Sequence, residues 1–537
     1  MLQTDQLLRI AARSHRVAAV FAAAILTACA VPDPDDPAID VTVEAAERAE
    51  RPSPGAPGIG DPLYPNLGNG GYDVEHYDLD LRYETAAPSQ GLDGAVTITA
   101  RATQALSRFD LDFGGDSLGA ISVDGRVATA VRDGDEVVIT PARAIGRGER
   151  FVVRIAQFSA TPGVPDPDDF LGAPFFSALD GTAWAGQPNG AHAIFPSNDH
   201  PRDKASFSFR IDVPAGTTAV ANGVLDGKHT AHGRTIWRYE QREPMATELA
   251  QVAVGELTVI SRGRHAGVIV RDVVPTRLAA ELEPKLAIEL SQIDWLEERL
   301  GSYPFETYGS LAATAGLGFA LETQTLSLYE TSLFDAAPQD FGPVMLHELA
   351  HQWFGDSVAP TQWSDVWQNE GHATWYEVTY QLDPDSPELA EQVRQVYALG
   401  DLFRALFGPV ASPRSGDPLD VFNPNVYAGG AVTLYALRQQ VGDRTFRRIE
   451  RAWVTKYRGC SASTADFIAL ASQISGQDLT AFLTDWLYGT TTPAMPGHPD
   501  WTVDPVPSGP TLAARPVAWQ PPFENPRGLL LLASHKH

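Results

Sequence analysis

The pattern of apolar and polar positions changes its period once along the chain, near residue 275. Between about residues 72 and 262, apolar and polar residues alternate in short runs that Gly, Pro, Asp and Asn interrupt, which is typical of strands with one buried face. Beyond residue 275 the apolar residues recur at helical spacing. The pattern predicts a multidomain α+β protein, β-rich first and mostly helical afterwards. Strands are expected at 72–83, 95–102, 109–113, 136–140, 151–156, 205–213, 217–223 and 235–241.

The helical half begins with a long amphipathic stretch at 277–301. It ends at Gly301, a residue suited to the C-cap of a helix. Pro284 inside the stretch either kinks the helix or marks its true first turn. Two short strands are expected next, at 308–312 and 320–329. Further helices are expected at 341–356, 364–382, 387–407, 427–441, 444–457, 463–474 and 478–488.

The first residues have the pattern of an export signal. Three arginines precede an apolar run of 12 residues at 17–28, which is short for a bilayer span of about 20 residues but suits a signal peptide. The run ends in Leu-Thr-Ala before Cys29, which resembles a bacterial lipobox. We therefore expect a lipid on Cys29 after cleavage before it. A plain secretory signal with a chance cysteine and an uncleaved membrane anchor are the alternatives.

Proline-rich segments flank the predicted domains. Residues 30–71 hold 8 prolines in 42 positions, and residues 491–537 hold 10 in 47. Such segments are typical of tethers and irregular extensions. The predicted order is a lipoprotein signal peptide at 1–28, a tether at 29–71, a β-rich domain at 72–262, a helical domain at 263–490 and a C-terminal extension at 491–537.

Composition and charge narrow the classes of function. Hydrophobic residues make up 44% of the 537, enough for a sizeable packed core. Lys and Arg number 40 against 67 Asp and Glu, a net charge of −27, so nucleic-acid binding through a general basic surface is excluded. Two cysteines exclude a disulfide-built scaffold and a Cys-rich zinc finger.

The sequence His-Glu-Leu-Ala-His at 347–351 fits the H-E-x-x-H motif. On a helix, positions i and i+4 lie on one face about 6 Å apart, so His347 and His351 could bind one zinc ion. Glu348 could reach water on that metal without ligating it. A buried helix with two incidental histidines is the alternative, so the interpretation needs a third ligand.

A second helical stretch offers candidates for that ligand, namely Glu370, His372 and Glu377. Glu370 follows His351 after 18 intervening residues, and an antiparallel helix pair joined by a loop near 358–361 could return it beside the first helix. Two imidazoles and one carboxylate suit a hydrolytic zinc that keeps one position open. A simple surface carboxylate is the alternative for Glu370.

These motifs resemble those of the aminopeptidase N family of zinc exopeptidases, which are gluzincins. Residues 68–83 resemble the start of the family's β-rich N-terminal domain, and 187–207 resemble its later strands. Phe-Ala-Leu-Glu-Thr at 319–323 resembles the exopeptidase motif, and 426–431 resembles the segment with the catalytic tyrosine. The resemblance covers about residues 68–490. It implies a saddle-like β-rich N-terminal domain followed by a thermolysin-like, mostly α-helical catalytic domain.

The resemblance also implies roles at the metal. His347, His351 and Glu370 would hold one Zn²⁺ per chain. Glu348 would be the general base that takes the proton of the zinc-bound water, whose pKa the metal lowers.

Three further residues would contact the substrate, by the same resemblance. Tyr427 would stabilise the oxyanion, Glu322 would bind the free α-ammonium group of a peptide, and Gln187 would line the same amine pocket. Each has an alternative interpretation: Tyr427 as a packed core aromatic, Glu322 as a solvated strand end, and Gln187 as an ordinary loop residue.

Some positions depart from the family pattern. His372 stands where the family usually has Phe; it could face solvent or the neighbouring domain, or form a hydrogen bond near the site. In the exopeptidase motif, Phe319 replaces Gly, Leu321 replaces Met and Thr323 replaces Asn. Phe319 and Thr323 could alter how the backbone meets the substrate, and hence its specificity.

The function expected from the sequence is therefore zinc-dependent cleavage of the N-terminal bond of peptides with a free N-terminus. An endopeptidase or another zinc hydrolase on the same scaffold is one alternative, and a non-catalytic surface binding lipoprotein is another. No nucleic-acid partner is expected. The expected location is the bacterial cell envelope, with membrane attachment through a lipid on Cys29, and secretion is the alternative.

Overall fold

A computed structural model describes residues 51–85, 87, 91–164, 173–414 and 421–506. Cys29 and the signal segment lie outside this described part, as does the end of the chain from residue 507. No helix within the described ranges combines the length and the apolar character that crossing a membrane requires.

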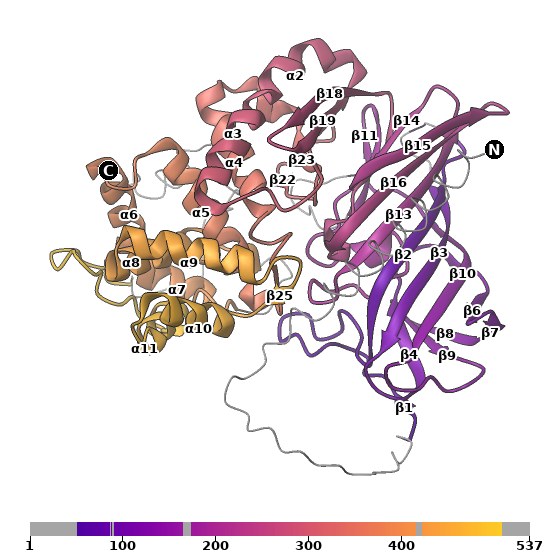
Figure 1. Cartoon of the computed structure of the whole chain (residues 1–537), viewed down its shortest axis with the longest axis horizontal. Coiled ribbons are helices and arrows are strands. Elements are labelled where there is room, and N and C mark those ends of the chain that lie inside the picture. The colour runs from indigo at the N-terminus through magenta and orange to yellow at the C-terminus, as the bar shows by residue number, and fades with distance from the viewer. Residues whose placement is uncertain (1–50, 86, 88–90, 165–172, 415–420, 507–537) are drawn as a thin grey trace, which may run out of the picture. The chain divides into compact units, whose positions relative to one another are not determined.

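The main feature of the N-terminal half is a nine-stranded sheet of order β15-β16-β13-β2-β3-β10-β6-β7, with β5 paired to β10. Figure 1 shows its long central strands side by side. Alternate residues point into the core: Tyr77, Leu79 and Leu81 of β2 are fully buried. The strands are β2 (Tyr72–Arg82), β3 (Leu92–Ala102), β5 (Ser117–Leu118), β6 (Ile121–Val123), β7 (Arg126–Val127), β10 (Arg150–Ala160), β13 (Ala205–Pro214), β15 (Val224–Ala231) and β16 (Arg234–Met245).

Two four-stranded sheets complete this β-rich domain and share its hydrophobic core. The first has the order β1-β4-β9-β8 and the second the order β11-β12-β17-β14. Their strands are β1 (Ser53–Pro54), β4 (Leu106–Asp112), β8 (Thr129–Asp133), β9 (Glu136–Thr140), β11 (Phe175–Ala178), β12 (Gly181–Trp184), β14 (Thr218–Ala221) and β17 (Val252–Gly255). The predicted strands are therefore present, together with shorter ones that the alternation did not reveal.

The second domain begins with a six-stranded sheet of order β18-β19-β21-β23-β22, to which β20 adds through β19. This sheet starts at Leu257, so β18 straddles the predicted boundary at 262/263. Alternation alone shows that a strand exists but not which sheet it joins. The strands are β18 (Leu257–His265), β19 (Val268–Pro275), β20 (Thr307–Tyr308), β21 (Ser310–Ala313), β22 (Ala320–Leu321) and β23 (Ser327–Glu330).

Helices make up the rest of the second domain. The predicted helix at 277–301 is divided at Ala287, with Pro284 inside the first part, and Gly301 (φ 95°) ends the second. The helices are α2 (Ala279–Leu286), α3 (Ile288–Leu300), α4 (Pro338–His351), α5 (Trp367–Gln381), α6 (Pro387–Ala398), α7 (Gly400–Phe407), α8 (Gly430–Val441), α9 (Asp443–Lys456), α10 (Thr464–Ser475) and α11 (Thr480–Tyr488).

The predicted tether needs a correction in its described part, residues 51–71. There the chain packs against the protein instead of extending away from it: β1 pairs with β4, and Tyr64 and Leu67 are buried in the core of the helical domain. Asp61 is buried as well and accepts hydrogen bonds. Proline content indicated an irregular segment, but it could not show that the apolar residues between the prolines find a buried surface.

Candidate metal centre

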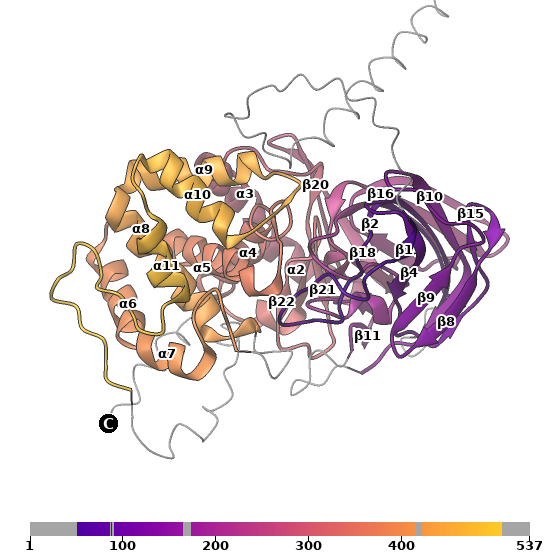
Figure 2. The ribbon, with the colours of Figure 1, turned by 90° about the horizontal axis from the view of Figure 1, so that it is seen from below.

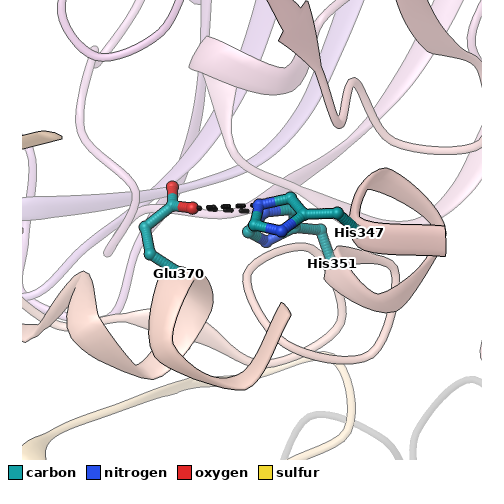
Figure 3. A group of neighbouring side chains, drawn as sticks. All are labelled: His347, His351 and Glu370. Atoms are coloured by element: carbon teal, nitrogen blue, oxygen red, sulfur yellow. Dashed lines mark ion pairs between the residues drawn. The ribbon is translucent and has the colours of Figure 1, made fainter. Parts of the chain in front are cut away.

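The two histidines of the motif lie one turn apart on α4, and Glu370 lies in the first turn of α5. The two helices pack against each other (Figure 2). A loop that contains β24 (Ala359–Pro360) joins them, and β24 pairs with β25 (Ser461–Ala462). Every residue of α4 from Phe341 to His351 is buried, so this helix is fixed on all sides. The predicted helix pair is present and presents the three side chains to one another (Figure 3).

The geometry of the three side chains suits a metal ion. Glu370 Oε2 lies 3.4 Å from Nε2 of His347 and 3.4 Å from Nε2 of His351. Around a tetrahedral zinc with bonds of about 2.0–2.2 Å, ligand atoms lie about 3.3–3.6 Å apart. Glu370 Oε2 is buried, and the two imidazoles are its ion-pair partners. A buried carboxylate oxygen needs positive charge beside it, and the N, N, O donor set fits zinc.

The outer nitrogens of both imidazoles are held by the protein. Nδ1 of His347 lies 3.1 Å from Oε2 of Glu377, and Nδ1 of His351 lies 3.1 Å from the carbonyl oxygen of Phe354, to which it can donate. Such contacts fix the ring orientation and direct Nε2 toward the shared point. Glu377 lies two turns after Glu370 on the same face of α5, and only this spacing could have predicted its contact with His347.

The carboxylates and imidazoles of the site stabilise each other's charged forms. Burial alone would raise the pKa of Glu370 and lower that of His351, but their mutual attraction outweighs burial. It holds the pKa of Glu370 at about 2 and raises that of His351 to about 9. Burial also opposes the charged form of His347, yet Glu370 and Glu377 raise its pKa well above the usual range. The pocket therefore favours a positive charge between these groups.

Glu348 lies beside this group without taking part in it. It is buried on α4, and its Oε1 has no hydrogen-bond partner in the described chain. Burial raises its pKa to about 8, with a further contribution from Glu322 and Glu370, although both histidines lower it. A carboxylate with a pKa near neutrality can both accept and release a proton. Its oxygen lies within 4.8 Å of ligand atoms of Glu322 and His351.

Glu322 and Gln187 come from different domains and meet at the site. Nε2 of Gln187 donates to Oε1 of Glu322 over 2.8 Å, and that Oε1 lies 3.9 Å from Nδ1 of His351. Glu322 follows β22 and is buried, which differs from a solvated strand end. Gln352, the residue after His351, donates to the backbone oxygen of Glu322 over 3.1 Å. The amine-binding candidates are thus fixed directly to the end of the metal-binding helix.

The ring of Tyr427 stacks beside that of His347. It lies in a π-helical turn, Asn425–Gly429, just before α8. The two rings are parallel within 12° with centroids 6.1 Å apart. Burial raises the pKa of Tyr427 well above its usual range, and the charges of Glu370, Glu322 and Glu348 add to this. The phenol therefore stays protonated and can act as a hydrogen-bond donor.

Comparison with known proteins places this site in a family. Residues 285–486 match the Peptidase family M1 domain, and residues 183–249 match the Peptidase M1 N-terminal domain. The chain belongs to peptidase family M1. Family membership accounts for the order of a β-rich N-terminal domain and a helical domain with the metal motif.

Solved M1 structures are similar over most of this chain. An M1 zinc metallopeptidase from Deinococcus radiodurans is 29% identical, with a TM-score of 0.71, and the match covers 82% of this chain and 99% of that one. A mutant from the same organism, bound to a Tyr-Ser-Ala substrate, also has 29% identity and a TM-score of 0.71, over 82% of this chain and 100% of that one.

Curated relatives are longer. Aminopeptidase M1-A of Oryza sativa subsp. japonica is 30% identical over 56% of this chain and 36% of its own length. Leucyl aminopeptidase of Saccharolobus solfataricus is 26% identical over 60% of this chain and 42% of its own length. The matched region thus spans well under half of these relatives.

His372 does not face solvent, which corrects one of the two interpretations of this departure from the family pattern. It is fully buried, and its ring stacks on Phe354 with centroids 4.2 Å apart. Nδ1 lies 2.7 Å from the carbonyl oxygen of Gln368, and Nε2 lies 3.4 Å from Oε1 of Glu450. The carbonyl oxygen of Phe354 can accept from His351, so His372 supports the metal centre through Phe354. It is not among the three converging donors, although the sequence offered it as a candidate ligand.

Lys204 is a residue of this site region that the sequence did not single out. Its ammonium group donates to the carbonyl oxygens of Asp356 and Ser357 over 2.6 and 2.9 Å. Burial lowers its pKa to about 7, although Asp356 and Glu248 oppose this. The β-rich domain therefore holds the turn that follows His351. No motif surrounds Lys204, and only the fold reveals its partners.

Proposed function

We propose that this M1 protein is a zinc-dependent aminopeptidase that hydrolyses the N-terminal bond of peptides. The observation that carries the proposal is the position of Glu322, whose buried carboxylate lies beside the candidate metal centre and accepts from Gln187. A carboxylate in this position can bind a free α-ammonium group and thereby place the first peptide bond at the metal. The names of the relatives, which include aminopeptidases and a substrate-bound zinc metallopeptidase, agree with this.

His347, His351 and Glu370 would hold the zinc, and Glu377 and the carbonyl of Phe354 would keep the imidazoles oriented. Zinc in such a site lowers the pKa of water and polarises a carbonyl.

The remaining steps belong to side chains of the protein. Glu348 accepts the proton of the attacking water at its carboxylate and can pass it to the leaving amine. Tyr427 keeps its phenolic proton and donates to the oxyanion, where one aimed donor is worth about 3 kcal/mol. Glu322 holds the substrate ammonium throughout.

A pair of peptides that differ only at the N-terminus tests the proposal. The zinc-loaded protein should release the first residue of a free peptide and leave the N-acetylated peptide intact, since acetylation removes the charge that Glu322 binds. Glu322→Gln should raise KM at least tenfold while zinc content stays stoichiometric. Cleavage of the acetylated peptide at internal bonds would instead identify an endopeptidase, and absence of both turnover and zinc would indicate a binding protein.

We further infer attachment to the bacterial cell envelope through a lipid on Cys29. The apolar run that ends at Cys29 supports this. Mass spectrometry of the N-terminal fragment should find cleavage before Cys29 and a lipid on its sulfur, and Cys29→Ser should release the protein from membranes. Cys460 is disulfide-bonded in the structure, so the same mass spectrometry must decide whether Cys29, the other cysteine of the sequence, is its partner in the mature protein; that disulfide would exclude the lipid.

A further inference from the structure

A cavity of about 130 Å³ lies behind the candidate metal centre, between α5, α6 and α8. One face of α5, including Thr374, Glu377 and Val378, forms one wall. Val393 of α6 and Ala431 of α8 lie on other sides. The cavity begins one residue beyond Tyr427, at Ala428, yet neither Glu322 nor the three candidate zinc ligands line it. It is therefore separate from the place where the peptide would bind.

The chemistry of the cavity wall selects against anions. Apolar side chains dominate it, and no Lys or Arg is among the described residues that line it. A carboxylate or phosphate would lose its water without gaining a cationic partner, which is costly in an apolar site. Among the described residues of the wall, Glu377 carries the one charged group, a carboxylate, so a cationic ligand is the one that the wall complements.

Three polar side chains of α5 line the cavity, Thr374, Glu377 and Gln381, and the first two lie one turn apart. Thr374 is 2% exposed, and its Oγ1 has no hydrogen-bond partner among the described residues. Buried hydroxyls in helices usually bond to a carbonyl one turn earlier, as Thr379 does with Trp375. A buried hydroxyl without a partner costs about 1–3 kcal/mol, which a ligand could recover.

Size limits the apolar part of the ligand. An apolar cavity of about 150 Å³ accommodates benzene, so about 130 Å³ suits one aromatic ring or a branched chain of similar volume. We infer that this cavity binds a small primary amine with such an apolar body. The ammonium group donates to Glu377 and Thr374, and the body packs against Val378, Val393 and Val432.

Binding here has a consequence for the metal centre, because Glu377 also contacts Nδ1 of His347 over 3.1 Å. An ammonium group on Glu377 competes for that carboxylate and weakens its hold on the imidazole. If the protein is the aminopeptidase proposed above, amine bound in this cavity should lower kcat, whereas amine bound at Glu322 would raise KM. This kinetic part rests on the proposed function, whereas binding itself does not.

Benzylamine binding to the zinc-loaded full chain, measured by calorimetry, tests the inference. We expect Ala431→Leu, which fills the cavity from a half-buried position, to weaken benzylamine binding at least tenfold. Thr374→Val should weaken it about fivefold, the equivalent of one hydrogen bond of about 1 kcal/mol. Ala390→Leu, a matched change at a half-buried position of α6 outside the cavity, should have no effect. Benzyl alcohol should bind more weakly, and phenylacetate should not bind.

The Glu322→Gln variant distinguishes amine binding in the cavity from amine binding at the peptide-amine site. Benzylamine binding should persist in that variant, and adding Ala431→Leu to it should weaken the binding at least tenfold. The opposite result, or equal affinity in wild type and Ala431→Leu, would overturn the inference, as would absence of binding at millimolar concentration. Unchanged thermal unfolding of both Leu variants excludes a folding defect. If no peptide is cleaved, the proposed function is wrong. The calorimetry still tests whether the cavity binds the amine.

Discussion

At the scale of single residues, the site separates the groups that would hold zinc from those that would move protons. His347, His351 and Glu370 face one point, and each imidazole is held on its outer side by another group. Glu348 and Tyr427 border that point but are not among the three converging donors. Substitution should therefore separate metal binding from catalysis.

Glu348→Gln should keep zinc and lose activity. The amide has nearly the same shape but cannot accept the proton, so kcat should fall by about 10²–10⁴ while zinc content stays at one per chain. Peptide turnover and metal analysis on the same preparation check this. Glu388→Gln, at an exposed position of α6, is the control. Activity close to wild type in Glu348→Gln would remove this residue from the mechanism.

Tyr427→Phe should affect kcat far more than KM. The ring still packs beside His347, but the donor to the oxyanion is gone, and loss of one such donor costs about 10²–10³ in kcat. Steady-state kinetics over a range of peptide concentrations give both constants. If only thermal stability changes, the residue has a packing role instead.

At the scale of elements, the described part of the predicted tether connects the β-rich domain to the start of α5. One oxygen of Asp61, Oδ2, accepts from the backbone N–H of Trp363 over 2.7 Å and lies 3.1 Å from Nε2 of His200. The other oxygen accepts from the N–H groups of Leu63 and Tyr64. Tyr64 also packs edge-on against Trp363. Because Trp363 lies seven residues before Glu370, these contacts help to place the third candidate ligand.

Asp61→Asn should therefore weaken both the fold and the metal site. The amide replaces one of the two accepting oxygens with an NH₂ donor, so at least one buried N–H loses its acceptor, at about 1–3 kcal/mol. We expect a lower midpoint of thermal unfolding and faster zinc loss to a chelator. Asp226→Asn, at an exposed position of β15, is the control for the loss of one negative charge. Unchanged zinc loss in a destabilised Asp61→Asn would restrict the contacts to a structural role.

Elements with a strong local pattern could be predicted from the sequence, and long-range contacts could not. The alternation in β2 and the spacing of His347, His351 and Glu370 are local signals, and the structure has the corresponding strand and helix pair. The contacts of Gln187 with Glu322, of His372 with Glu450 and of Lys204 with the turn after α4 join residues at least 78 positions apart. Such contacts depend on how the domains pack, which periodicity does not encode.

At the scale of the whole molecule, the β-rich domain contributes directly to the site through the loop that carries Gln187. A short helical turn, η2 (Ala191–Ala193), follows Gln187. His192 in this turn contacts Asp199 through both its backbone N–H and its Nδ1, over 3.0 and 2.6 Å. Asp199 in turn accepts from Thr247 over 2.7 Å. This set of contacts ties the amine-site loop to the rest of the β-rich domain.

The contact between His192 and Asp199 predicts a loss of stability at alkaline pH. Burial opposes the charge on His192, but Asp199, with Asp112 and Asp135, outweighs it and raises the pKa to about 9 from 6.5. The folded state therefore holds a proton that the unfolded state releases between pH 6.5 and 9. This contribution is fully present below pH 6.5 and is lost as the pH rises through 9; at most it amounts to about 3 kcal/mol.

Urea unfolding of wild type and His192→Gln at pH 6 and pH 9.5 measures this contribution. The difference in unfolding free energy between the two proteins should be largest at pH 6 and should shrink toward zero at pH 9.5. Taking the difference cancels every pH-dependent term that both proteins share, the metal site included. His229→Gln, at an exposed position of β15, should show no such trend. A difference that stays constant with pH would mean that His192 is neutral in the folded protein and that the loop of Gln187 is held by packing alone.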